Sequence, residues 1–284
     1  MPAAVCITEF TDPACPFAYS AEPVRTRLRW LYGEHIDFVA RMVVLSESPD
    51  DYLERGFTPE KQSASFRSIS HNHKMPIDTR TRPRMAATMP ACRAVVAARL
   101  RAPDRMRILL RRLRLRHFAG ELLDDDATID GAAADAGIEP ARLREWWAGD
   151  DVAQALEEDL RLAREPLPAA RVLDAKLANW SGGRRYTCPS YEIVRLSDGV
   201  RIAVPGFQPF AVYDVITANL VPGLERREPA RSAEEVLAWT GTPLATQEVA
   251  VVRDVSFDEA HEELSRVATL HPLGYDGFWT LPGA

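Results

Sequence analysis

The sequence predicts an α/β fold with a helical insertion and a small α+β extension at its C-terminal end. Three patterns indicate this fold: an early strand–helix–strand segment, a late pair of short strands followed by a helix, and a long helical stretch between them. A chain of 284 residues also exceeds the usual size of one domain. We assign the α/β domain to residues 1–50 and 166–222, the insertion to 51–165 and the extension to 223–284.

The first fifty residues have the pattern of a βαβ unit. Residues 4–10 mix apolar and β-branched side chains, which predicts a strand, and the prolines that follow end it. Apolar residues recur at steps of three and four from Phe17, which predicts a helix to about Tyr32. Residues 36–45 are nearly all apolar, which indicates a second, buried strand. This spacing predicts a right-handed crossover between two parallel strands.

Cys15 stands at the predicted junction between the first strand and its helix. Pro16 follows it and suits the first position of a helix. Free amides and the positive end of the dipole at a helix start stabilise a thiolate, which is the nucleophilic form of cysteine. Cys15 is therefore a candidate nucleophile, and the alternative is an inert cysteine buried in a loop.

Two short strands are predicted late in the chain, on either side of a turn. Residues 192–196 and 200–204 flank a Ser-Asp-Gly turn, which predicts a β-hairpin. Pro209 then begins a helix that runs to about residue 220. Cys188 and Pro189 stand just before this hairpin.

This order of elements resembles the thioredoxin fold, specifically the DsbA-like branch with a helical insertion. The segment Asp-Pro-Ala-Cys-Pro-Phe-Ala-Tyr at residues 12–19 looks like the active-site segment of that branch, including its FrnE and 2-hydroxychromene-2-carboxylate isomerase relatives. Pro189 aligns with the cis-proline that faces the active-site cysteine in these folds. The resemblance covers residues 1–222 and implies a thiol-disulfide oxidoreductase whose insertion caps Cys15.

The chain departs from the family's Cys-x-x-Cys motif, because Ala18 occupies the position of the second cysteine. In thioredoxin-like folds the residue before the cis-proline lies beside the active-site cysteine, and here that residue is Cys188. We therefore expect Cys15 to attack and Cys188 to resolve the mixed disulfide, which requires Cα atoms about 4.4–6.8 Å apart. The alternative is that Cys188 only fills space as a small apolar residue.

The resemblance leaves two further functions open. Cys15 could serve a glutathione- or other small-thiol-dependent isomerase or transferase, with the small thiol as a co-substrate and no tightly bound cofactor. The chain could instead be a non-catalytic binding or regulatory protein on a degenerate redox fold. For the enzyme, the substrate is a small thiol or a protein disulfide. The residues expected to line its pocket are Pro16, Phe17, Tyr19 and Trp180.

Other chemistry-bearing residues have simpler interpretations. Cys6 and Cys92 are expected to be packed in a strand and a helix, and no metal site is expected, since His71 and His73 lack a third ligand. These histidines are interpreted as part of a polar loop. With Arg80, Arg82 and Arg84 they could border the cysteine and attract an anionic thiol. Six arginines between residues 105 and 116 are interpreted as a solvated, internally compensated face.

The last sixty residues resemble a small winged helix. Ser–Glu capping boxes at Ser232 and Ser256 begin two helices, and glycines at 274 and 277 mark a hairpin. Residues 231–284 hold three arginines against nine acidic residues, so this segment would repel nucleic-acid phosphates. We expect a packing or homodimerisation module and no nucleic-acid partner.

The sequence also predicts a cytoplasmic location. No apolar run approaches the roughly 18 residues that a membrane-spanning helix needs. The first ten residues lack the positive start of a secretory signal. We therefore expect no membrane partner and a compartment that keeps thiols reduced. The net charge of −6 gives no indication of nucleic-acid binding.

Overall fold

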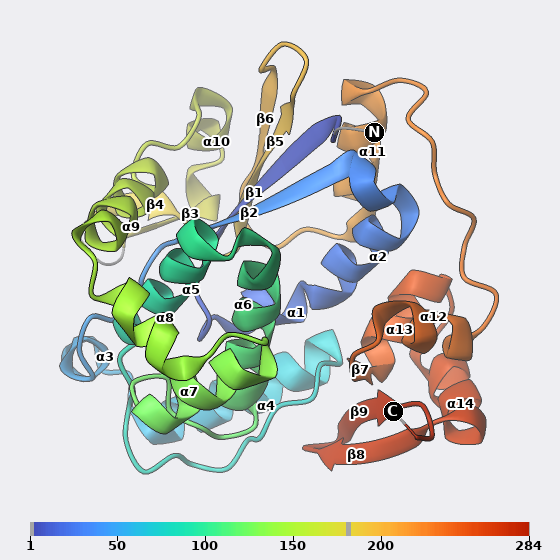
Figure 1. Ribbon diagram of the computed structural model, residues 1–284, viewed down its shortest axis with the longest axis horizontal. Helices are drawn as coiled ribbons and strands as arrows, with labels where there is room; N and C mark the ends of the chain where they lie inside the picture. The colour runs from blue at the N-terminus through green and yellow to red at the C-terminus, as the bar shows by residue number, and fades with distance from the viewer. Residues whose placement is uncertain (1–2, 180–182, 284) are drawn as a thin grey trace.

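The computed structural model describes residues 3–179 and 183–283. Figure 1 shows a sheet flanked by helices, a group of helices to one side of it, and a separate small extension that holds the C-terminus. This arrangement confirms the predicted α/β fold with a helical insertion and an α+β extension. No helix within the described ranges is long and apolar enough to cross a membrane.

The central sheet has four strands in the order β2-β1-β5-β6, with one parallel and two antiparallel pairings. The strands are β1 (Val5–Thr11), β2 (Ile36–Met42), β5 (Ser190–Arg195) and β6 (Arg201–Val204). Its helices are α1 (Pro16–Ser20), α2 (Glu22–Tyr32) and α11 (Phe210–Leu220). Apolar residues of α2 and α11, such as Leu28 and Tyr213, pack with Ile7 and Ile193 of the sheet. The predicted βαβ unit and late hairpin are thus both present.

The insertion is a bundle of helices around an alanine- and leucine-rich core. Its helices are α3 (Asp50–Glu54), α4 (Pro59–His73), α5 (Met89–Arg101), α6 (Pro103–Phe118), α7 (Asp126–Asp135), α8 (Pro140–Trp147) and α9 (Asp150–Ala163). Between the bundle and the late hairpin lie α10 (Pro168–Val172), β3 (Leu177–Asn179) and β4 (Arg184–Tyr186), and the last two form a small antiparallel sheet.

Helix α4 corrects one prediction, since His71 and His73 lie in its last turn rather than in a polar loop. The helix is capped by Thr58, whose hydroxyl accepts from the Lys61 amide. Its buried face is marked chiefly by Phe66 and by small polar residues. That face is too polar for hydrophobic periodicity to reveal it.

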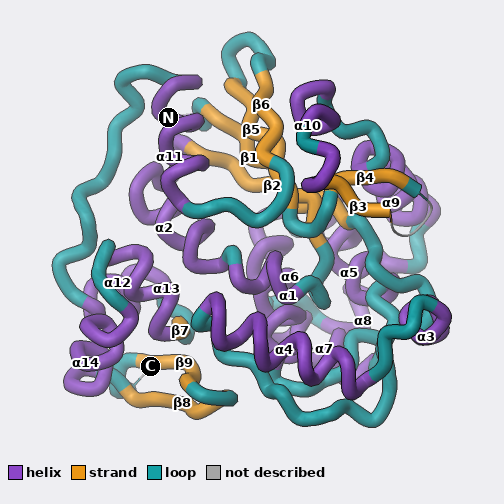
Figure 2. The backbone as a smooth tube through the Cα atoms, turned by 180° about the vertical axis from the view of Figure 1, so that it is seen from behind, coloured by secondary structure: helices purple, strands orange, loops and turns teal. Residues whose placement is uncertain are grey.

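The extension has the element order expected of a small winged helix, with one short strand that the sequence did not predict. Its elements are α12 (Ala233–Thr240), β7 (Leu244–Ala245), α13 (Thr246–Arg253), α14 (Phe257–Val267), β8 (Thr269–Leu273) and β9 (Asp276–Thr280). Residues 221–232 connect it to α11 along the outside of the molecule (Figure 2). Buried Trp30 of α2 packs into the core of the extension, so the extension rests directly on α2.

A buried ion network joins these parts. Arg114 of α6 is 1% exposed and donates to Glu9 of β1 at 3.1 Å and to Glu22 of α2 at 2.6 Å. Arg111, one turn earlier, pairs with Glu248 of the extension at 2.7 Å. The interpretation of these arginines as a solvated face is therefore wrong in part. Their carboxylate partners lie on other elements, where helix periodicity cannot show them.

Replacing Arg114 with methionine should strongly destabilise the protein. The change leaves the buried carboxylates of Glu9 and Glu22 with fewer cations, and breaking a buried ion pair costs about 3–5 kcal/mol. Urea unfolding followed by circular dichroism measures the change. Arg161→Met is the control, because Arg161 makes only exposed pairs with Glu158 and Glu165 and should hardly move the midpoint. Equal midpoints for the two variants would contradict the importance of the network.

Candidate thiol site

Cys15 caps the N-terminus of α1. Its backbone is extended, and its Sγ accepts a hydrogen bond from the Ala18 amide at 3.5 Å. The turn before it is held by Asp12, whose side chain accepts from the Ala14 amide at 2.7 Å. Pro16 begins the helix, as the sequence predicted. Cys15 is only 4% exposed, and it lines one wall of a pocket.

Cys188 lies in the loop between β4 and β5, and the structure brings this loop against Cys15. The Cys15 thiol donates to the Cys188 carbonyl oxygen at 3.2 Å. The peptide bond between Cys188 and Pro189 is cis. Both thiols are free in this structure. Burial and then the hydrogen bond and charge of Cys15 raise the pKa of the Cys188 thiol.

A mainly apolar pocket of about 510 Å³ opens beside the two cysteines. Pro16 and Phe17 line it, and Phe17 is 41% exposed there. Most of its other apolar lining residues come from the insertion and from the segment after β2, and they include Leu45, Tyr52, Phe57, Phe66 and Ile69. The insertion therefore covers the site, as the resemblance implied. Trp180, expected to line the pocket, lies outside the described residues.

Tyr19 does not line this pocket, which corrects the prediction. It is fully buried, stacks on Phe118 with ring centroids 4.3 Å apart and donates to the Pro76 carbonyl at 2.8 Å. Residues two apart on a helix point to different sides, so Tyr19 faces the core when Phe17 faces the pocket.

Arg185 is the cation of the site, and the sequence analysis missed it. Its side chain lines the pocket, is 2% exposed and donates to the Tyr186 carbonyl at 2.6 Å. Its charge lowers the pKa of the Cys188 thiol, against the larger effects of burial and of Cys15. The only sequence signal was a position three residues before Cys188, which does not reveal burial.

Asp12 supplies the opposing charge. This fully buried carboxylate accepts from the Leu45 amide at 2.9 Å and from the Thr88 hydroxyl at 2.7 Å, so it ties the Cys15 turn to the insertion. It also accepts from the Cys92 thiol at 3.4 Å. Cys92 is fully buried in the core of the insertion, as predicted, and burial and then the charge of Asp12 raise its pKa.

The remaining cysteine, histidine and arginine candidates have separate outcomes. Cys6, expected to be packed in its strand, is partly exposed on β1. His73 packs edge-on against Phe17 with centroids 5.8 Å apart, and burial lowers its pKa. The three arginines proposed to border the cysteine, Arg80, Arg82 and Arg84, do not line its pocket. Arg80 pairs with Asp78, Arg82 contacts His117, and Arg84 pairs with Asp124. The residues that the structure describes contain no cluster of three groups able to hold a metal ion.

Comparison with known proteins places this geometry in context. A family model described as a DSBA-like thioredoxin domain matches residues 6–166. The ClpXP adapter protein SpxH of Halalkalibacterium halodurans is 27% identical over an alignment of 291 positions, which covers 96% of this chain and 87% of SpxH.

Solved structures share the fold. A Nitrosomonas europaea protein assigned as a protein disulfide isomerase aligns with a TM-score of 0.57 and 17% identity, over 76% of this chain and 96% of its own. The cytosolic disulfide reductase DsbM of Pseudomonas aeruginosa aligns with a TM-score of 0.54 and 17% identity, over 76% of this chain and all of its own. These likenesses support the DsbA-like fold, and the FrnE branch stays a prediction.

Replacing Arg185 with glutamine should slow alkylation of Cys188. The pKa of the thiol rises when the cation is removed, and one pKa unit changes the thiolate fraction about ten-fold. Iodoacetamide labelling of the reduced protein at pH 9, quantified by peptide mass spectrometry, measures the rate. Arg184→Gln is the matched control, because its side chain is exposed and pairs with Asp174. Similar Cys188 rates in both variants would refute the role of Arg185.

Proposed function

The chain belongs to the DSBA-like thioredoxin domain family, and on that premise we propose that it is a thiol-disulfide oxidoreductase with Cys15 as nucleophile and Cys188 as resolving thiol. The observation that carries this proposal is the contact between the Cys15 thiol and the Cys188 carbonyl at 3.2 Å. Since Ala18 removes the usual second cysteine, Cys188 is the thiol that can complete a two-electron cycle.

The proposed cycle balances without a bound cofactor. The Cys15 thiolate attacks one sulfur of a substrate disulfide, forms a mixed disulfide and releases the first substrate thiol. Cys188 then attacks Cys15 Sγ, so the second substrate thiol leaves and a Cys15–Cys188 disulfide remains. The substrate gains two electrons, and the two protons of the cysteines end on its thiols. Two molecules of a small thiol such as glutathione reduce the disulfide again, which suits the predicted cytoplasmic location.

The surroundings of the thiols suit this cycle. The apolar pocket beside Cys15 can take an apolar segment of a protein disulfide or the body of a small disulfide. Arg185 stabilises the resolving thiolate at Cys188, and burial keeps water away from the mixed disulfide. Pro189 lies directly after Cys188 and shapes the loop that presents it.

Mild oxidation should link Cys15 to Cys188. Peptide mapping after treatment with glutathione disulfide should give a Cys15–Cys188 peptide in the unaltered protein. Cys188→Ser should instead retain glutathione on Cys15, because nothing resolves the mixed disulfide. Cys15→Ser should yield neither product. Cys6→Ser is the control, since Cys6 lies on β1 and should leave the pattern unchanged.

Two outcomes would contradict this mechanism. Glutathione that persists on Cys15 in the unaltered protein, with no linked peptide, would favour the small-thiol-dependent isomerase or transferase. An unmodified Cys15 under all conditions would exclude thiol chemistry at this site.

A second function, that of a protein adapter, is favoured by one specific observation. The SpxH match spans 96% of this chain, and SpxH is named as an adapter for ClpXP. An adapter needs a binding surface but no resolving cysteine, which fits the alanine at position 18. We therefore propose protein delivery to ClpXP as the alternative to the redox cycle.

The double variant Cys15→Ser/Cys188→Ser separates the two functions. If the chain is an adapter, deleting its gene should lengthen the half-life of at least one ClpX-dependent protein, and the double variant should restore that half-life. Pulse-labelled quantitative proteomics measures the turnover, and a strain without ClpX is the control. Turnover that is unaffected by the deletion, or restored only by the chain with both cysteines, would contradict a thiol-independent adapter.

A further inference from the structure

A second cavity, separate from the thiol pocket, lies where three parts of the molecule meet. Its volume is about 130 Å³, and its walls come from β1, α2, β2, α6 and residues 240–244 of the extension. The side chains that carry charge are six arginines and two glutamates. They are Arg25, Arg29, Arg107, Arg111, Arg112 and Arg114, together with Glu9 and Glu22. A cavity with this lining carries a large excess of positive charge.

Three of these arginines are already neutralised by carboxylates. Arg25 and Arg114 pair with Glu9 and Glu22 at distances between 2.6 and 3.1 Å. Arg111 is held by Glu248 of the extension at 2.7 Å. Every carboxylate of the cavity is thus committed to the buried network that holds the fold together.

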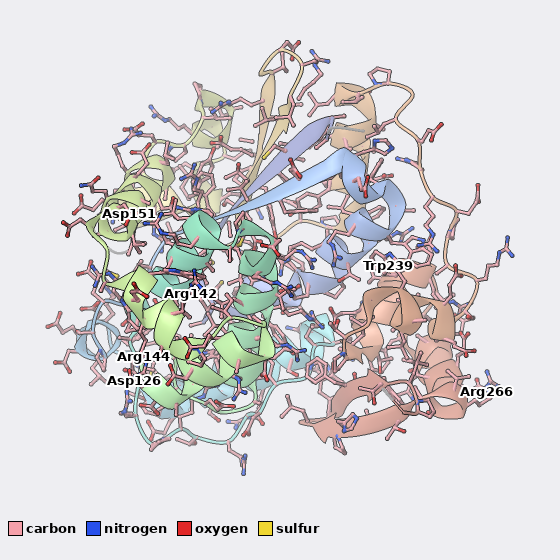
Figure 3. All side chains as sticks on the ribbon, viewed as in Figure 1. Asp126, Arg142, Arg144, Asp151, Trp239 and Arg266 are labelled. Carbon is pink, nitrogen blue, oxygen red and sulfur yellow. The ribbon has the colours of Figure 1, made fainter. Side chains whose placement is uncertain are left out.

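The other three arginines have no such partner. Arg29, Arg107 and Arg112 make no ion pair within 4.0 Å and no side-chain hydrogen bond with any residue in the described ranges. Arg29 is half-buried, and its guanidinium lies 5.3 Å from the ring of Trp239, which belongs to α12 of the extension and is labelled beside α2 in Figure 3. Burial and then the charge of Arg107 lower the pKa of Arg29 to about 10. The charges of Arg29 and Arg107 therefore repel each other in the cavity.

We propose that this cavity binds a small phosphate-bearing anion, either inorganic phosphate or the phosphoryl group of a small metabolite, through Arg29, Arg107 and Arg112. A phosphate carries more than one negative charge and four oxygens, so it can accept from several guanidinium groups at once. A water needs about 10–15 Å³ of such space, so the cavity has room for several water-sized groups. That space is large enough for a phosphate group.

The position of the cavity gives the anion a structural effect. Arg29 belongs to α2, Arg107 and Arg112 to α6, and the opposite wall to the extension. An anion that neutralises these arginines would relieve repulsion between α2 and α6 beneath the extension. The site does not involve Cys15 or Cys188, so it stands whether or not the proposed redox cycle does.

Isothermal titration calorimetry of the full-length reduced protein tests the proposal at constant ionic strength. The probes are inorganic phosphate, pyrophosphate and glucose 6-phosphate, and saturable binding of at least one is expected. The tightest probe tells whether the source is the free ion or a phosphorylated metabolite. Arg29→Gln and Arg112→Gln should each weaken that binding about ten-fold or more, because each removes charged hydrogen bonds.

Arg142→Gln is the matched control. Arg142 likewise lies over a tryptophan, with its guanidinium 5.6 Å from the ring of Trp146, but it belongs to the insertion and is well removed from the extension (Figure 3). Its variant should bind the probe as the unaltered protein does. Absence of saturable binding for all three probes, or an equal loss in Arg142→Gln, would overturn the proposal.

Stability without the anion supplies an independent readout. In phosphate-free buffer Arg29→Gln should unfold at the same or a higher urea concentration than the unaltered protein, because it removes like-charge repulsion. Added phosphate should raise the midpoint of the unaltered protein and not that of the variant. A lower midpoint for Arg29→Gln in phosphate-free buffer would show a purely structural role and overturn the proposal.

Discussion

The buried pairing of Glu9 and Glu22 with Arg25 and Arg114 is the interaction on which the rest of the structure depends. It joins the first strand, the second helix and the centre of the insertion. Arg114 also donates to the Thr11 hydroxyl at 2.6 Å, at the end of β1. Arg25 donates to the Ala18 carbonyl at 2.6 Å. The same network therefore fixes both the strand that leads to Cys15 and the helix that Cys15 caps.

Local sequence signals predicted the elements whose cause is local. The capping box at Ser256 is present, with its hydroxyl accepting from the Glu259 amide, and the early strand–helix–strand unit forms as its spacing indicates. The pairing of Cys15 with Cys188 came from the family resemblance, since no spacing rule joins residues so far apart. Helix α4 was missed because its buried face is largely polar.

Burial of charge was the property that the sequence hid most completely. Arg114 and Arg185 look like surface residues in any pattern of periodicity, yet both are almost fully buried. An arginine is stable in the interior only when acceptors surround it. Those acceptors come from Glu9 and Glu22 for Arg114, and from a backbone carbonyl for Arg185. Whether an arginine is buried depends on partners that lie on distant elements, so the sequence pattern around that arginine does not predict its burial.

Resolution by Cys188 changes the energetics of the proposed disulfide. A disulfide between cysteines three residues apart reduces the conformational entropy of the unfolded chain by about 2 kcal/mol. Cys15 and Cys188 are 173 residues apart, and a disulfide between them reduces it by about 5 kcal/mol. Because folding and disulfide formation are thermodynamically linked, a disulfide that stabilises the fold is itself stabilised by folding to the same extent. The unfolded chain, however, forms the long-range disulfide less readily by the same entropy, so loop length alone leaves the reduction potential of the pair in the folded protein unchanged. The geometry around Cys15 and Cys188 in the folded protein, and not their separation along the chain, therefore determines whether the proposed pair reduces or forms disulfides.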